Sequence, residues 1–155
     1  MRLNQIFKIE YINAGLSARG KDDALAELVN VVKDGGLPLN TSAIIDILKQ
    51  RESLGSTGIG EGVAIPHGKI SALNEIVVAF GRSRNGIAYD SLDGKPVHLF
   101  FLLLAPENSA GQHLKILAKI SKMLKDVNFR NRLLGAKSRD DLYKIIIEQE
   151  SACIV

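Results

Sequence analysis

Apolar positions along this chain of 155 residues change between helical and strand spacing. The spacing over Asp22–Lys33 predicts an amphipathic helix that Gly35 and Gly36 end. A second helix is expected to begin after Asn40 or Thr41 and to end near residues 51–53. Its inward positions would be Ala43, Ile44, Ile47 and Leu48. Residues 1–20 have no clear period, which predicts an irregular or partly paired lead-in.

Two apolar runs predict buried strands in the middle of the chain. Ile76–Phe80 is the first, and Val97–Ala105 is the second. The second run is apolar on both faces, which is typical of a central strand covered by helices on both sides. Between the runs, the Asn-Gly pair in Arg82–Gly86 predicts a turn, and Tyr89–Pro96 reads as a turn-rich link.

The last third of the chain has helical character. Ser109 to Gln112 has the pattern of a capping box and predicts a helix that runs to about Lys125. A short helix over 129–134 and a last helix after Ser138 are expected to follow. Strands that alternate with helices predict an α/β sandwich, with a mixed, mainly parallel central sheet flanked by helices on both faces. We expect a single domain over residues 1–155.

Composition excludes several classes of protein. No apolar run approaches the ~18 residues that a membrane span requires, so membrane insertion is not expected. A single cysteine, Cys153, predicts a reducing compartment and therefore a cytoplasmic protein. The net charge of +3 is modest. The lysines between Lys115 and Lys125 are interpreted as a solvated helix face opposite Leu114 and Leu117, so no nucleic-acid partner is expected.

The stretch Arg51–Lys69 is unusual because it gathers glycines around a short apolar run. Val63-Ala64-Ile65 is stopped by Pro66, directly before His67. Proline restricts its own backbone and favours an extended conformation in the residue before it. The pattern predicts a short strand that ends abruptly and presents one imidazole beside a loop with exposed N–H groups. The glycines are Gly55, Gly58, Gly60, Gly62 and Gly68.

This stretch carries a specific resemblance. Glu52 is followed after six residues by Ile59-Gly60, and after two more by Val63–Gly68. The spacing resembles the active-site signature of enzyme IIA components of the bacterial sugar phosphotransferase system, fructose/mannitol class, and is most similar to the nitrogen-regulatory branch. The likeness continues through Asp93–Val97, Ala105-Pro106 and His113-Leu114.

The resemblance implies a phosphoryl relay with His67 as acceptor. Its donor would be a histidine-phosphorylated carrier protein, and transfer would pass through Nε2. A neutral imidazole has a lone pair for this chemistry at cytoplasmic pH. Arg51 supplies a guanidinium fork that matches phosphate oxygens, and His113 lies near a helix N-terminus, where anions are favoured. The family brings the residues at these three positions together.

Ser56, Thr57 and Gly58 offer hydroxyl groups and backbone amides, and are expected to support the phosphate. No cofactor and no metal are expected. His98, on the apolar strand, is interpreted as a packing residue.

The sequence suggests three alternatives to a regulatory phosphoryl carrier. A nucleotide-binding loop at Gly58–Gly62 is rejected, because it lacks the G-x-G-x-x-G and Walker spacings. A zinc hydrolase would use His67, His98 and His113, but their scattered placement fits no short ligand motif. Within the family, a regulator would bind target proteins according to its phosphorylation state, whereas a sugar-uptake enzyme IIA would pass phosphate to a IIB domain. A chain without fused IIB or IIC domains favours the regulator.

Overall fold

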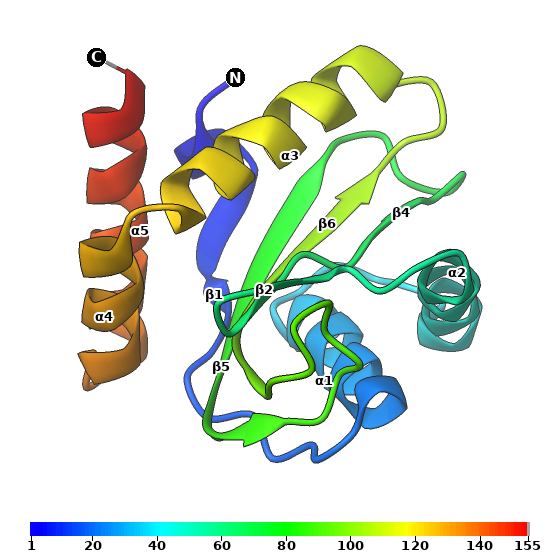
Figure 1. The fold of residues 1–155 in the computed structure, drawn as a ribbon. Helices are drawn as coiled ribbons and strands as arrows, with labels where there is room; N and C mark the ends of the chain where they lie inside the picture. The colour runs from blue at the N-terminus through cyan, green and yellow to red at the C-terminus, as the bar shows by residue number, and fades with distance from the viewer. Residues whose placement is uncertain (155) are drawn as a thin grey trace.

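A computed structural model describes residues 1–154 as an α/β fold built on one mixed sheet (Figure 1). The six strands run in the order β1-β5-β6-β3-β2, and β4 pairs with β6 as well. The pairs β1–β5, β3–β6 and β4–β6 are parallel, whereas β2–β3 and β5–β6 are antiparallel. The predicted α/β sandwich is confirmed; Val155 lies outside the described residues.

The elements are a 3₁₀ helix Leu3–Gln5, β1 Phe7–Asn13, α1 Lys21–Asp34, α2 Thr41–Ser53, β2 Gly58–Gly60, β3 Val63–Ala64, β4 His67–Lys69, β5 Val77–Ile87, β6 Val97–Ala105, α3 Ala110–Leu124, α4 Val127–Gly135 and α5 Arg139–Ile154.

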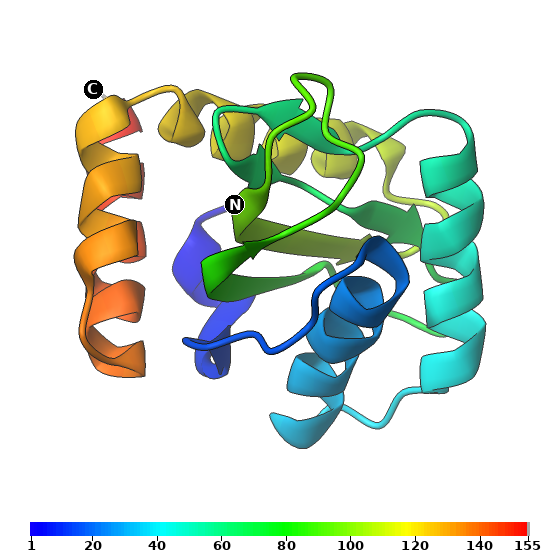
Figure 2. The ribbon, with the colours of Figure 1, turned by 60° about the horizontal axis from the view of Figure 1, so that its bottom comes forward.

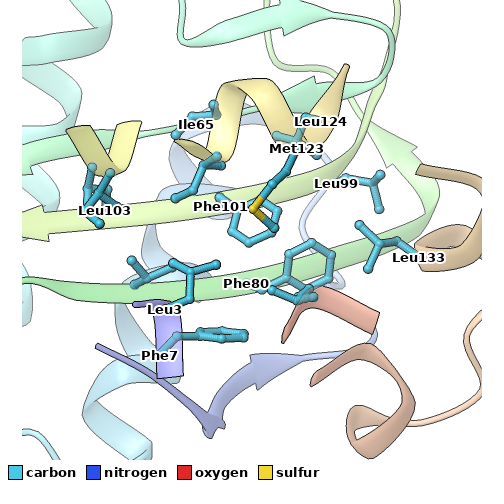
Figure 3. Close-up of a cluster of buried hydrophobic side chains, with 14 of the residues drawn as sticks. Leu3, Phe7, Ile65, Phe80, Leu99, Phe101, Leu103, Met123, Leu124 and Leu133 are labelled. Carbon is cyan, nitrogen blue, oxygen red and sulfur yellow. The ribbon is translucent and has the colours of Figure 1, made fainter. Parts of the chain in front are cut away.

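Strand β6 separates two hydrophobic cores, one on each face of the sheet. Leu99, Phe101 and Leu103 belong to the core beneath α3, α4 and α5, part of which Figure 3 shows. Phe100 and Leu102 belong to the core beneath α1 and α2. Figure 2 shows α1 and α2 away from α4 and α5, on the other side of the strands. Because neighbouring residues of a strand point to opposite faces, a strand with apolar residues on both faces contributes to both cores.

The helix predictions are largely confirmed. α1 covers the predicted range, and α2 begins after Asn40, whose side chain accepts a hydrogen bond from the Ala43 backbone N–H at 3.2 Å. Of the four positions expected to face inward on α2, Ile44 and Leu48 are buried, Ile47 is partly buried and Ala43 is exposed. No helix within residues 1–154 is long and apolar enough to cross a bilayer.

The lead-in is partly paired, as expected: β1 pairs in parallel with β5 at the edge of the sheet, with a register shift between Phe7 and Ile12. The predicted turn over Arg82–Gly86 is wrong, because β5 continues through it to Ile87. Gly86 does have a positive φ of 85°, as the Asn-Gly signal suggests. Gly86 lies where the β5–β6 register shifts, between Arg82 and Ile87. The strand forms a bulge there and continues in the same direction.

Arg82 explains why the strand continues. Its side chain is 1% exposed, and its Nε donates to the carbonyl of Ala14 at 3.0 Å. Its Nη1 donates to the carbonyl oxygens of Leu133 and Ala136, at the end of α4. The guanidinium therefore joins three segments inside the fold. Burial, and secondarily the charge of Arg84, lowers the pKa of Arg82 from its usual 12.5.

Two details of α3 also differ from expectation. Ser109 precedes the helix as predicted, but its hydroxyl donates to the carbonyl of Pro106 at 2.7 Å and makes no capping hydrogen bond. Leu114, expected to face the core, is 66% exposed. The buried face of α3 carries His113, Ile116, Ile120, Met123 and Leu124.

Candidate functional site

His67 is the first residue of β4 and lies beside Leu103, near the carboxyl end of the central strand β6. β3 pairs in parallel with Leu99 and Phe100, and the Pro66 carbonyl accepts a hydrogen bond from the Leu103 backbone N–H at 3.0 Å. The chain then pairs again with β6 as β4, from His67 onward. The predicted short strand before Pro66 is confirmed, and the second pairing fixes the backbone of His67 on both sides. In Figure 1, β4 lies between α2 and α3.

The ring of His67 has a defined orientation and tautomer. Its Nδ1 lies 2.8 Å from the carbonyl oxygen of Ile65, which can only accept a hydrogen bond. Nδ1 therefore carries the ring proton. At the other nitrogen, Nε2 accepts a hydrogen bond from Nε of Arg51 at 3.3 Å. The lone pair of the imidazole consequently lies on Nε2 and points toward the guanidinium.

Arg51 reaches this ring from the last turn of α2. A second nitrogen of its guanidinium, Nη1, donates to the carbonyl of Gly55 at 2.9 Å. This hydrogen bond joins the end of α2 to the glycine-rich loop and keeps the guanidinium next to Nε2 of His67. Gly68 permits this approach, because a Cβ there would lie only 3.1 Å from Ile47 on the same helix. Residues 47 and 51 share one face of the helix.

His113 completes the cluster from the opposite side. Its ring centroid is 5.5 Å from that of His67, and the two planes are nearly perpendicular. The side chain is buried, and within the described chain Nδ1 has no hydrogen-bond partner. Burial lowers the pKa of His113 from 6.5, and the neighbouring ionisable groups of His67 and Lys69 lower it further. His113 is therefore neutral at pH 7.

The cluster opens into a hollow of about 510 Å³ between α2 and α3. Its lining includes Lys69 and the exposed leucines Leu54 and Leu114, which are 84% and 66% exposed. Sequence reasoning missed all three as site residues. Lys69 could have been found, because the period of two in a strand places it on the face of His67. An exposed leucine carries no such signal in the sequence.

The predicted phosphate-supporting residues lie elsewhere. Ser56, Thr57 and Gly58 do not line the hollow. The hydroxyl of Ser56 lies 3.2 Å from the carbonyl of Tyr89 and accepts from the Gly58 N–H at 3.1 Å. The hydroxyl and backbone N–H of Thr57 both donate to the carboxylate of Glu52. The structure thus brings together Arg51, His67 and His113, but not these three.

His98 is separate from the cluster. Its Nδ1 lies 2.9 Å from the carbonyl of Ser83. Five positions along β6 separate it from Leu103, the strand partner of His67, which corresponds to about 16 Å. Among the described residues, no group of three or more His, Cys, Asp or Glu side chains is arranged to hold a metal ion. The three histidines therefore do not form a zinc site.

Comparison with known proteins identifies the family of this chain. The family model "Phosphoenolpyruvate-dependent sugar phosphotransferase system, EIIA 2" matches residues 5–149. A nitrogen regulatory protein from Bradyrhizobium diazoefficiens is 39% identical over 94% of this chain and 95% of its own length. The fructose-specific EIIABC component of Bacillus subtilis is 35% identical over 97% of this chain, which spans only 24% of that longer protein.

Structural similarity leads to the same family. The crystal structure of nitrogen regulatory protein IIA-Ntr from Neisseria meningitidis matches with a TM-score of 0.84 and 32% identity, over 93% of this chain and 98% of that one. The family match covers nearly all of the chain and includes the three residues of the site, Arg51, His67 and His113. The chain therefore belongs to the EIIA 2 family of the phosphoenolpyruvate-dependent sugar phosphotransferase system.

Proposed function

We propose that this protein is a phosphohistidine carrier that receives a phosphoryl group on Nε2 of His67. The observation that carries the proposal is the fixed ring of His67. Its proton is on Nδ1, bound to the Ile65 carbonyl, and its lone pair is on Nε2, beside a guanidinium. A nucleophile whose lone pair already points at a cation is prepared to receive a negatively charged group.

The proposed donor is a carrier protein phosphorylated on histidine. The new bond forms between Nε2 of His67 and phosphorus as the donor's phosphorus–nitrogen bond breaks. The electron pair of the broken bond stays on the donor imidazole, and the proton on Nδ1 of His67 does not move. Phosphoryl transfer asks for positioning and for charge stabilisation around the equatorial oxygens, rather than for further covalent chemistry.

Arg51 and His113 would stabilise the transferring group. The guanidinium of Arg51 would turn from Nε2 of His67 to the phosphoryl oxygens, which match its planar fork. His113, neutral because its pKa is lowered, would donate from Nε2, since its Nδ1 is buried. Lys69 adds positive charge at the rim of the hollow. Ser56, Thr57 and Gly58 are not part of this proposal, because their polar groups are already bonded to Tyr89, to Glu52 and to one another.

We further propose that phosphorylation controls the binding of target proteins, as a nitrogen-regulatory enzyme IIA would. The TM-score of 0.84 to a nitrogen-regulatory protein supports this branch. Phosphorylation adds about −1.5 to −2 charges at neutral pH, beside two exposed leucines that a partner would cover. A sugar-uptake role remains the second candidate, favoured by the 35% identity to a fructose-specific component. Both roles agree with a cytoplasmic protein.

Incubation with a phosphorylated histidine carrier tests the relay. We expect an acid-labile phosphoryl adduct that maps to His67, and no adduct in His67→Ala. His98→Gln is the matched control, because it removes a histidine outside the cluster and should still be phosphorylated. An adduct on another residue, or none on the wild-type protein, would refute the proposal. Adding a fructose-type IIB domain to the phosphorylated protein then separates the two roles, since rapid transfer to it would favour sugar uptake.

A further inference from the structure

Glu52 is a buried carboxylate directly after Arg51, on the last turn of α2. The residue is 8% exposed, and three groups donate to it. The backbone N–H of Thr57 lies 3.0 Å from Oε1, the hydroxyl of Thr57 contacts Oε2, and the ammonium of Lys21 lies 3.0 Å from Oε1. Every donor comes from outside α2, so this carboxylate joins the helix end to the glycine-rich loop and to the start of α1.

Tyr89 extends this cluster inward. Its phenol oxygen lies 3.2 Å from the hydroxyl of Thr57, and the ammonium of Lys21 lies 4.8 Å from the centre of its ring. Burial, and then the charge of Glu52, raises the pKa of Tyr89 far above its usual 10. The phenol therefore keeps its proton and stays available as a donor inside the fold. The side chains of Lys21, Glu52, Thr57 and Tyr89 together form what we call the Glu52 cluster.

Hydrogen bonds lead from the Glu52 cluster to the ring of His67. The carbonyl of Thr57 accepts a hydrogen bond from the Ile65 N–H at 3.1 Å. The carbonyl of Ile65 in turn lies 2.8 Å from Nδ1 of His67. Glu52 thus binds the backbone N–H of Thr57, and the carbonyl of Thr57 binds Ile65. The carbonyl of Ile65 then determines which ring nitrogen of His67 carries the proton. The same carboxylate anchors the helix turn from which Arg51 reaches Nε2.

We propose that Glu52 is a positioning residue: its contacts with Lys21 and Thr57 hold the glycine-rich loop so that His67 keeps its proton on Nδ1 and its lone pair on Nε2, opposite Arg51. The inference rests on the proposed function of His67 as phosphoryl acceptor. Glu52 touches neither His67 nor the transferred group, and acts through Thr57 and Ile65. Effects of this kind are large, because a displacement of about 1 Å can slow a reaction by about 100-fold.

The fold contains a matched control for such a buried ion pair. Glu150 is 1% exposed, accepts from the backbone N–H of Leu3 at 2.7 Å, and pairs with Lys119 at 2.8 Å. Like Glu52, it receives a backbone N–H and an ammonium from distant segments. It lies on α5, outside the lining of the hollow. Glu150→Gln should therefore lower stability in the same manner without reaching His67.

The experiment compares Glu52→Gln with Glu150→Gln. Four quantities are measured: the midpoint of thermal unfolding, kcat and KM for a phosphorylated histidine carrier, and the ¹⁵N NMR shifts of the His67 ring without phosphate. We expect Glu52→Gln to lower kcat by about 10- to 100-fold with KM unchanged. Its ¹⁵N shifts should move toward a mixture of the two tautomers. Glu150→Gln should lose thermal stability but keep the wild-type kcat and ring shifts.

A pair of substitutions at Thr57 provides the rescue. Thr57→Val keeps the shape but removes the hydroxyl that binds Glu52, and should shift kcat and the ring tautomer in the same direction. Thr57→Ser restores the hydroxyl and should recover most of both. Wild-type kcat and ring shifts in Glu52→Gln, or an equal loss of kcat in Glu150→Gln, would overturn the positioning role. Because the ring shifts need no phosphorylation, they test Glu52 even if the wild-type protein accepts no phosphate.

Discussion

Gly68 controls how closely α2 approaches β4, so we expect Gly68→Val to separate Arg51 from His67. A Cβ at position 68 would lie 3.1 Å from Cγ2 of Ile47 and 3.4 Å from Cδ2 of Leu48. Carbon atoms pack best at about 3.5–4.0 Å, so one added carbon requires a shift of about 0.4 Å. The two further methyl groups of valine need more space. The Arg51–His67 hydrogen bond, now 3.3 Å, would lengthen to at least about 3.7 Å and be lost.

The expected energies follow from this displacement. Overpacking destabilises the folded protein by about 1–3 kcal/mol, and the reduced entropy of the unfolded chain offsets about 0.4–1 kcal/mol, so the net loss of stability is expected to be about 0–2.6 kcal/mol. The rate of phosphorylation should fall by at least about tenfold. Urea unfolding and timed phosphorylation measure the two effects. Removing the clashing methyl in the double variant Gly68→Val with Ile47→Ala should recover part of both, because neighbouring sites couple.

Gly111→Ala is the control for Gly68→Val. It lies in the first turn of α3, and a Cβ there would meet nothing within 4 Å. The helix should gain up to about 1 kcal/mol, with an unchanged rate of phosphorylation. A Gly68→Val protein that accepts phosphate at the wild-type rate would show that the close contact between α2 and β4 does not position Arg51.

Two further outcomes are expected. Arg82→Met should lower the free energy of unfolding by about 2–4 kcal/mol in urea, because the carbonyls of Ala14, Leu133 and Ala136 lose their donor; unchanged stability would contradict this. Because the pKa of His113 is lowered in the folded protein, the unfolded chain binds more protons below pH 6.5, so stability should fall as pH drops from 6.5 toward the folded pKa. His113→Gln should remove this part of the pH dependence between pH 7.5 and 5, and an identical slope in both proteins would exclude it.

Local sequence signals predicted the elements that local physics decides. α1 and α2 have apolar spacing, and Asn40 caps α2 through its own side chain. β6 is apolar at every position except His98, so both of its faces need cover, which favours a central place in the sheet. The glycines and Pro66 marked the chain segment of His67 for the same reason: they constrain the backbone where they stand.

Features that depend on distant partners were not predictable. An arginine three residues before Asn85-Gly86 reads as part of a surface turn. Arg82 is nevertheless buried, because carbonyl groups at the end of α4, some fifty positions later, accept hydrogen bonds from it. Leu114 follows the helical pattern of a core residue, and only the tertiary arrangement leaves it at the rim of the hollow. The phosphate-supporting role expected of Ser56 and Thr57 follows from residue type alone, whereas their side-chain directions depend on Tyr89 and Glu52.

Glu52 also raises an electrostatic question at the site, because a carboxylate beside Arg51 could compete with a phosphoryl group for the guanidinium. In the structure, the carboxylate of Glu52 points away from Arg51 and pairs with another cation. The carboxylate turns to Thr57 and to the ammonium of Lys21 at 3.0 Å, and its side chain is 4% exposed. Within residues 1–154, Arg51 meanwhile donates to two neutral acceptors, Nε2 of His67 and the carbonyl of Gly55. An anion arriving at His67 would therefore replace a neutral partner of Arg51. The guanidinium is available to it, because Arg51 forms no ion pair with Glu52.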